Sequence, residues 1–263
     1  LLSRRQRQMC IRDRYSINLV QGLVNAGVQL DSTVLAAYES WCTASVNDPD
    51  PGFWGHWPRY YAEMPVKQDW VQAAAKRCQT AVVVIGRSAG EDRENTLKKG
   101  SFYLTNKEKA LLDAVTAAFQ KVVLVLNIGS IMDFAEIDAY GDKISAILLA
   151  WQLGMESGNA VADVLTGQVN PSGRLTDTIA KTYADYPAQN FGNKAENRYT
   201  EDIFVGYRYF ETFAPERVLY PFGYGLSYTD FACEVKKTEI KDRTVTVQAV
   251  SYTHLRAHET ELH

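Results

Sequence analysis

Three short, predominantly apolar runs constrain the fold of this chain more than any other feature of its sequence. They occupy residues 81–85, 121–126 and 144–150. Such runs are typical of strands that are buried on both faces of a parallel sheet. Amphipathic segments alternate with them, and we expect helices at residues 16–25, 31–41, 66–78, 105–119, 131–140 and 157–165. The alternation predicts an α/β fold with a doubly wound, mainly parallel sheet and helices on both faces.

Local signals refine this expectation. Thr105 and Glu108 have the spacing of a capping box, so a helix should begin there. A short strand is expected at 28–30. After Pro171 the chain becomes irregular, with strand-like pieces at 203–210, 231–236 and 244–250. The alternation of Thr and Val in the last piece indicates the opening of an all-β module.

The composition excludes several classes of function. The chain has 263 residues, 46% of them hydrophobic, and a net charge of −3. This balance gives no indication of nucleic-acid binding, and no apolar run is long enough to span a membrane. The cysteines lack metal-ligand spacing, and we interpret Cys42, Cys78 and Cys233 as buried thiols. No cofactor motif is present.

Both ends of the sequence differ from the rest. Residues 1–14 carry five Arg and one Asp, and residues 251–263 hold three of the four histidines. The strings QMCIRD and SYTHLRAHET resemble translated sequencing-adapter read-through, so we interpret both ends as non-native. The alternative is a basic arm and a tail in which His254 and His258, four residues apart, bind a metal on a helix.

A candidate site follows the strand at 81–85. Gly86 ends the strand, and the next residues include a dense group of charges: Arg87, Glu91, Asp92, Arg93 and Glu94. Ligands of open parallel sheets bind at the carboxyl ends of the strands. The alternative is a solvated surface loop. His56, which stands in an aromatic-rich loop at 47–65, is interpreted as a structural or solvated histidine.

Several segments together resemble the C-terminal α/β domain of glycoside hydrolase family 3. They are IGRSAGEDRE, KGSFYLT, VVLVLNIGS, AILLAWQLGMESGNAVADVLTGQVNPSGRL, FVGYRYFE and YPFGYGLSYTDF. The resemblance covers residues 15–231, without the family's first sheet strand. Residues 232–250 resemble the start of the fibronectin type III-like domain that follows in many members.

The resemblance implies a retaining β-glycosidase, most similar to β-glucosidases, that acts on terminal β-linked glucosides or xylosides without a cofactor. An N-terminal barrel domain of the same parent chain supplies the nucleophilic aspartate, which has no counterpart here. Glu91 matches the general acid/base, because it follows Gly90 and precedes the block at 99–104. Such an acid needs a raised pKa and a second carboxyl about 5–5.5 Å away. We therefore expect an inactive fragment of an enzyme.

Other charged residues have weaker claims. Asp92 and Glu94, on the same loop, are alternative candidates for the general acid/base. Arg87 and Arg93 could orient the loop or touch substrate, although ion pairs with Asp92 or Glu94 are favoured. For Glu156 a role at a helix N-terminus is favoured over a polar site residue.

Structural roles are favoured for two further groups of residues. Trp151 is expected in the core or a domain interface. Gly154, Gly158 and Gly173 would permit tight turns and close packing.

Two other functions stay open at the level of sequence. The first is a non-catalytic carbohydrate-binding or interface module. The second is a nucleotide-binding domain that uses the loop at 86–90, although neither G-x-G-x-x-G nor a P-loop lysine is present.

Overall fold

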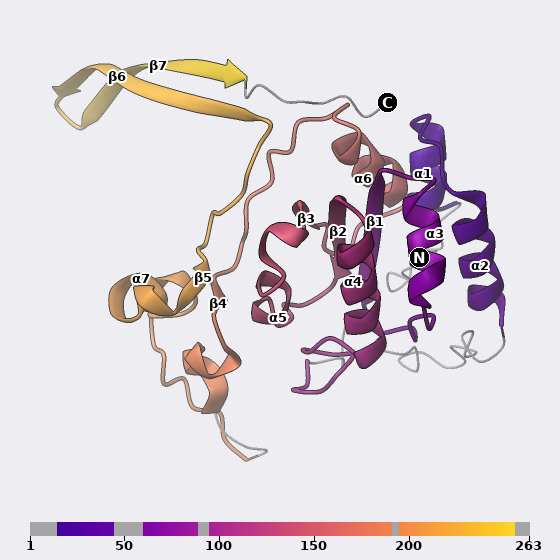
Figure 1. The fold of residues 1–263 in the computed structure, drawn as a ribbon. Helices are drawn as coiled ribbons and strands as arrows, with labels where there is room; N and C mark the ends of the chain where they lie inside the picture. Colours follow the sequence, from indigo (N-terminus) through magenta and orange to yellow (C-terminus); the bar gives the residue numbers. More distant parts are fainter. Residues whose placement is uncertain (1–14, 45–59, 89–94, 191–194, 256–263) are drawn as a thin grey trace.

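A computed structural model describes residues 15–44, 60–88, 95–190 and 195–255. Figure 1 shows a body of helices packed around a small sheet, a second group of short elements beside it, and a long hairpin that extends away from both. No helix of the described residues is long and apolar enough to cross a membrane.

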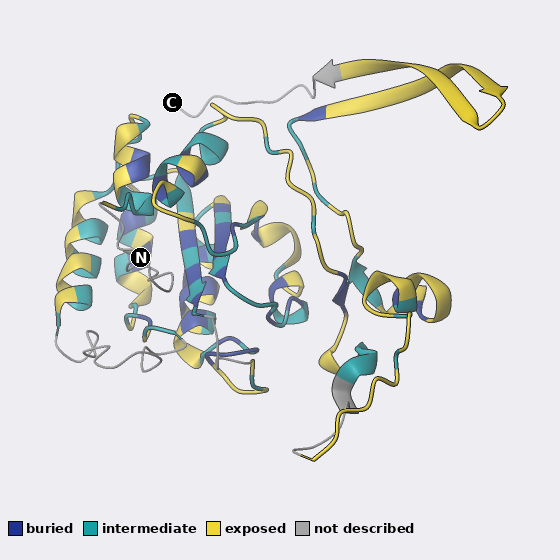
Figure 2. Cartoon of the chain, turned by 180° about the vertical axis from the view of Figure 1, so that it is seen from behind, coloured by how far each residue is buried: buried dark blue, intermediate teal, exposed yellow. Residues whose placement is uncertain are grey.

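The central sheet is parallel, as the apolar runs predict. Its strands are β1 (Thr80–Arg87), β2 (Lys121–Ile128) and β3 (Ala146–Leu149), in the order β1-β2-β3. Figure 2 shows that buried residues concentrate in β1 and β2. The expectation that the third run is buried on both faces is wrong, because β3 pairs only with β2 and Ile147 remains 37% exposed.

One face of the sheet carries the main core. It is covered by α3 (Gln68–Ala75), α4 (Asn106–Ala118) and the short helix α5 (Ala135–Asp138). Leu112 of α4 and Leu124 of β2 are fully buried in this cluster. Burial of a leucine side chain contributes about 1.5–3 kcal/mol, so this face supplies most of the sheet's packing energy.

The opposite face packs against α1 (Leu19–Asn25) and α6 (Ser157–Leu165). Val125 of β2 and Val161 of α6 are the buried centre of this second cluster, and Leu19 of α1 packs against it. Helices therefore lie on both faces of the parallel sheet, as expected for a doubly wound fold. The remaining helix of the body, α2 (Ser32–Thr43), begins at Asp31, whose carboxylate accepts from the amides of Thr33 and Val34.

Capping side chains determine where two other helices begin. The capping box predicted at Thr105 and Glu108 is present, and α4 follows it. An equivalent box joins Asn18 and Gln21 at the start of α1. Each box satisfies amide groups that have no partner within the first helical turn.

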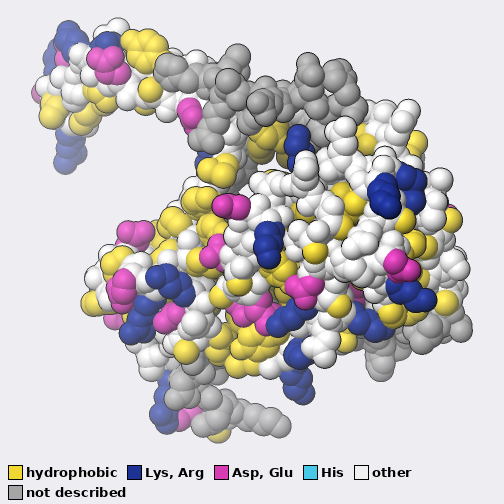
Figure 3. Space-filling view, viewed as in Figure 1, with side chains coloured by type: hydrophobic (Ala, Val, Ile, Leu, Met, Phe, Trp, Pro, Cys, Tyr) yellow, Lys and Arg dark blue, Asp and Glu magenta, His cyan; other side chains and the backbone are white. Residues whose placement is uncertain are grey.

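A second group of elements follows residue 171. It contains β4 (Ile179–Ala180), α7 (Tyr207–Phe213), β5 (Val218–Tyr220) and the 3₁₀ turns Tyr183–Asp185, Pro187–Asn190 and Pro215–Arg217. β4 and β5 pair antiparallel. Figure 3 shows hydrophobic side chains on the surface of this group and of the hairpin.

Four local expectations are wrong. Residues 28–30 form no strand but lead into the cap of α2. Residues 203–210 are not a strand, because Gly206 turns the chain at φ +59° and α7 starts after it, with Phe210 buried. The helix expected at 131–140 is confined to α5, followed by a 3₁₀ turn, Gly141–Lys143. The three cysteines are not buried: Cys42 and Cys78 are half-buried, and Cys233 is exposed.

The chain continues into an antiparallel hairpin, β6 (Thr229–Lys241) and β7 (Thr244–Leu255). Lys236 is an extra residue in β6, where the register shifts between Val235 and Lys237. This bulge changes which residues of β6 share a face. Apolar residues before and after it therefore lie on one face, which we call the hairpin apolar face: Phe231, Cys233, Val235, Ile240, Val245, Val247 and Ala249.

Candidate active site

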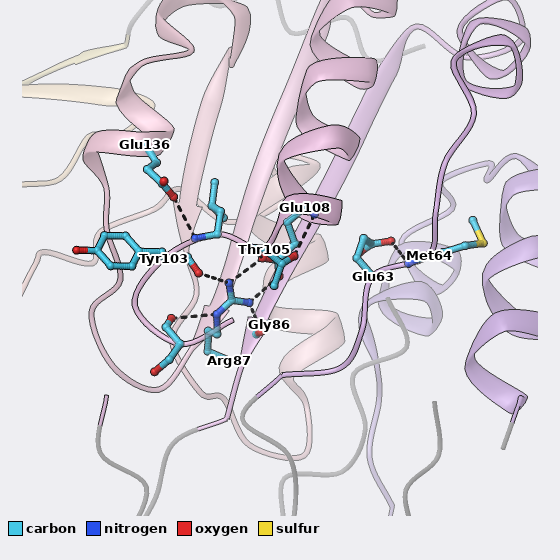
Figure 4. A network of polar contacts seen from close by, with 10 residues as sticks. Glu63, Met64, Gly86, Arg87, Tyr103, Thr105, Glu108 and Glu136 are labelled. Atoms are coloured by element: carbon cyan, nitrogen blue, oxygen red, sulfur yellow. Dashed lines mark hydrogen bonds and ion pairs between the residues drawn. The ribbon is translucent and has the colours of Figure 1, made fainter. Parts of the chain in front are cut away.

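Arg87 is the last residue of β1 and is buried at the carboxyl end of the sheet. Its guanidinium nitrogens Nη1 and Nη2 donate to Glu108 Oε1 at 2.7 Å and Oε2 at 2.8 Å. It also donates to the backbone carbonyls of Gly86, Ser101 and Tyr103. These contacts use all five N–H groups of the guanidinium. Figure 4 shows Arg87 at the centre of this network.

Glu108 has a second task at the start of α4. Its Oε2 atom accepts from the backbone amide of Thr105 at 2.7 Å, and its own amide donates to Thr105 Oγ1. The capping glutamate is therefore also the counterion of Arg87, and both side chains are about 5% exposed. A buried charge is tolerated only when it is paired and hydrogen-bonded, and this pair meets both conditions.

The block that follows the acidic loop is held against the next strand connection. The amide of Asp133 donates to the carbonyl of Phe102 at 2.8 Å, and the amide of Leu104 donates to Glu136 Oε2 at 3.0 Å. Lys109 forms an ion pair with the same glutamate. These contacts fix residues 95–104 over the carboxyl ends of β1 and β2.

Gly100 lets an aromatic ring close one side of this network. Its φ is +81°, and a Cβ atom there would lie 2.1 Å from the ring of Tyr60. The same ring lies 5.7 Å from the Arg87 guanidinium carbon, a cation–π contact. Only glycine combines this backbone conformation with this close approach.

Glu63 is a buried carboxyl for which the local sequence carries no signal. It is 5% exposed and accepts from the Tyr38 hydroxyl at 2.9 Å and the Met64 amide at 2.8 Å. Burial raises the pKa of Glu63, an effect that the Tyr38 hydrogen bond opposes. Its isolated position in a loop provides no periodic signal from which burial could be inferred.

The sequence-predicted site residues have different outcomes. Glu91, Asp92, Arg93, Glu94 and His56 lie outside the described residues, so their roles stay predictions. Among the described residues, Arg87 donates to Glu108 and to backbone carbonyls; the expected ion pairs with Asp92 or Glu94 stay predictions, because both carboxylates lie outside the described residues. The capping-box spacing identified Glu108, but only the fold brings it to Arg87.

Two other candidates have structural contacts. Glu156 stands at the N-cap position of α6. Its carboxylate accepts from the Tyr15 hydroxyl and from the side-chain Nδ2 of Asn159, each at 2.6 Å, rather than from the helix backbone. The pKa of Tyr15 is raised by this hydrogen bond. Trp151 is half-buried and packs against the main core, as expected.

Among the described residues, no group of three or more His, Cys, Asp or Glu side chains is placed to hold a metal ion. The hydrogen bonds of Arg87 and Glu108 form a rigid frame at the carboxyl end of the parallel sheet. In the sequence, the acidic segment lies between Arg87 and Asn95, which both belong to the described residues next to this frame.

A parallel sheet with helices packed on both faces defines a doubly wound α/β domain. The family model for the glycosyl hydrolase family 3 C-terminal domain matches residues 7–228. The chain belongs to this family. The match ends one residue before β6 begins.

Individual relatives agree with the assignment. A β-glucosidase of Ruminococcus albus is 46% identical over 224 residues, which are 84% of this chain and 23% of that protein. An exo-α-(1→6)-L-arabinopyranosidase of Bifidobacterium longum is 35% identical over 74% of this chain and 26% of its own length. The crystal structure of a β-glucosidase from Paenibacillus barengoltzii superimposes with a TM-score of 0.83 at 39% identity, over 90% of this chain and 26% of that one. The chain thus spans about a quarter of the length of these relatives.

Proposed function

We propose that this chain is the acid/base-bearing part of a longer retaining β-glucosidase. The observation that carries the proposal is the 46% identity to the Ruminococcus albus β-glucosidase over 84% of the chain. The frame around Arg87 supports it, because it lies at the end of the sheet where ligands of such folds bind. The Bifidobacterium relative acts on a different sugar, so the matched segment by itself leaves the sugar open.

In the proposed reaction Glu91 is the general acid and then the general base. Its carboxyl proton passes to the glycosidic oxygen as that oxygen leaves the anomeric carbon, and an aspartate of a barrel domain attacks the same carbon. Water then attacks the glycosyl–enzyme ester, its proton goes to Glu91, and the aspartate is released. The chain alone holds one partner of this pair and is expected to be inactive.

The test places this chain in a complete enzyme. Residues 15–231 replace the matching segment of the Ruminococcus albus β-glucosidase, and the chimera is compared with its Glu91→Gln and Glu91→Ala variants. For cellobiose, whose leaving group needs protonation, we expect kcat/KM to fall about 10²–10⁴-fold. For a dinitrophenyl β-glucoside, whose leaving group needs no acid, it should change little. Azide should partly restore turnover of the dinitrophenyl substrate by Glu91→Ala, with a glucosyl azide as product.

Asp92→Asn and Glu94→Gln are the matched controls, since both remove a carboxylate from the same segment. If either reproduces the leaving-group dependence and Glu91→Gln does not, Glu91 loses its role. A folded chimera that releases glucose equally well with Glu91→Gln on both substrates would refute the acid/base assignment.

We also propose that residues 232–250 begin a fibronectin type III-like domain. The hairpin apolar face supports this proposal, because a β-sandwich buries one such face of each sheet against the other. A two-stranded hairpin is marginally stable alone. Extension of the chain with the residues that follow the matching segment in the Ruminococcus albus protein should protect the β6 and β7 amides from hydrogen exchange. Unchanged exchange would count against the proposal.

A further inference from the structure

Ser101 links the two ends of the segment that carries Glu91. This residue is 5% exposed and lies in the block that precedes α4. Its backbone carbonyl accepts from Arg87 Nε at 3.1 Å, on the side where the chain leaves β1. Its hydroxyl donates to Asn95 Oδ1 at 3.1 Å and accepts from the Thr96 amide at 2.9 Å, where the chain returns.

The departing end is rigid for reasons independent of Ser101. Arg87 belongs to β1, whose register with β2 extends to the pair of Arg87 and Ile128. Its buried bidentate pair with Glu108 ties it to the first turn of α4. Five donated hydrogen bonds leave the guanidinium a single position.

The returning end contacts the Ser101 hydroxyl directly. Asn95 is exposed, and its side-chain Oδ1 accepts from the Ser101 hydroxyl. The side-chain Nδ2 of Asn95 donates to the carbonyl of Ile131. The Thr96 amide has the same hydroxyl as its acceptor. The Thr96 carbonyl also accepts from the backbone amides of Lys98 at 2.7 Å and Phe102 at 3.2 Å. The Ser101 hydroxyl is the side-chain group that contacts both Asn95 and Thr96 at this end.

We propose that Ser101 is a positioning residue for the acid/base: its hydroxyl fixes Asn95 and Thr96, and thereby sets the reach of the segment between Arg87 and Asn95. This inference rests on the proposed function of Glu91. Proton transfer in a transition state requires the donor within hydrogen-bond reach, and a displacement of about 1 Å can cost 10²-fold in rate. Loss of the hydroxyl should therefore impair reactions that need the acid and spare those that do not.

Ser101→Ala in the chimera is the decisive variant. It removes the hydroxyl and keeps the backbone carbonyl that Arg87 contacts. We expect kcat/KM for cellobiose to fall about 10–100-fold and that for the dinitrophenyl β-glucoside to fall less than about threefold. A merely structural loss would lower both by the same factor. Asn95→Ala removes the other partner, and the double variant should be no worse than the more impaired single one.

Ser145→Ala is the matched control. The Ser145 hydroxyl also accepts a hydrogen bond from one backbone amide, that of Val122 at 3.2 Å. This contact lies at the amino ends of β2 and β3. It should leave the ratio of the two substrates unchanged. The proposal would be overturned if Ser101→Ala lowered kcat/KM by the same factor for both substrates. It would also be overturned if Ser145→Ala changed the ratio of the two kcat/KM values as much as Ser101→Ala does.

Hydrogen exchange of this chain by itself supplies a readout that does not involve Glu91. In Ser101→Ala the Thr96 amide should exchange at least about tenfold faster, whereas amides of β1 keep their rates. Unchanged exchange at Thr96 would refute the structural step. If Glu91→Gln fails to distinguish the two substrates, the proposed function fails. If it distinguishes them and Ser101→Ala does not, only the positioning role fails.

Discussion

Gly22 of α1 lies so close to Gly158 of α6 that a Cβ atom on Gly22 would stand 2.0 Å from the Gly158 carbonyl oxygen. A Cβ atom on Gly158 would in turn lie 1.9 Å from the carbonyl oxygen of Asn18. The Gly158 amide donates to the Ile17 carbonyl at 2.9 Å across the same contact. Backbone thus meets backbone where the two helices cover one face of the sheet.

Gly22→Ala should destabilise the chain although alanine is the better helix former. The gain in helix propensity is about 1 kcal/mol, whereas separation of the two helices should cost about 1–3 kcal/mol beyond that gain. Urea unfolding followed by circular dichroism measures the difference. Gly154→Ala is the control, because a Cβ atom there meets nothing within 4 Å. Equal stability of Gly22→Ala and the parent chain would contradict the close crossing.

Removal of one partner of the Arg87–Glu108 pair should destabilise the chain more than replacement of both partners by apolar residues. Arg87→Met or Glu108→Leu leaves one buried partner of the pair unmatched and should lower the free energy of unfolding by about 3–5 kcal/mol. The double variant Arg87→Met/Glu108→Leu should lose less than the sum of the single changes. A double-mutant cycle in urea measures this coupling. Additive losses would mean that the two side chains act independently.

Glu63 should make stability depend on pH. Burial raises its pKa in the folded chain above the ordinary value of 4.5, so the folded state holds the proton more tightly than the unfolded state. Its contribution is fully present below the unfolded pKa and is lost as the pH rises through the folded pKa.

Glu63→Gln should therefore become progressively more stable, relative to the parent chain, as the pH rises from about 4 towards neutrality. Urea unfolding at a series of pH values gives the comparison. Glu39→Gln, on the exposed side of α2, is the control. If the free energies of unfolding of Glu63→Gln and the parent differ by the same amount at every pH, Glu63 has the same pKa in the folded and unfolded states.

The hairpin apolar face should cause this chain to self-associate. Ile240 is 75% exposed and Val247 is 54% exposed, and exposed apolar patches on strands with open edges promote pairing with a second copy. Ile240→Lys/Val247→Lys should lower the average mass in sedimentation velocity. Thr246→Lys, on the opposite face, is the control. If the double variant sediments like the parent chain, the face does not mediate association.

Part of this architecture could be predicted from local pattern alone. The continuous apolar runs at β1 and β2 identify buried parallel strands, because only residues shielded on both faces have no polar alternation. The capping box at Thr105 marks the start of α4 because its hydrogen bonds are local. The strand predicted at 203–210 is wrong because its apolar spacing suits a strand, whereas Gly206 turns the chain and Phe210 is buried on the helix α7 that follows.

The sequence by itself determined the family, the parallel sheet, the first turn of α4 and the candidate acid/base, since each depends on residues that are close together in the chain. Only the tertiary structure decided the partners of Arg87, the role of Ser101, the burial of Glu63 and the contact of Gly22 with Gly158. Several of these contacts join distant residues: Arg87 and Ser101 are 14 positions apart, Arg87 and Glu108 are 21 apart, and the two glycines are 136 apart. No local period encodes such pairs, because the packing of the helices on the sheet brings them together.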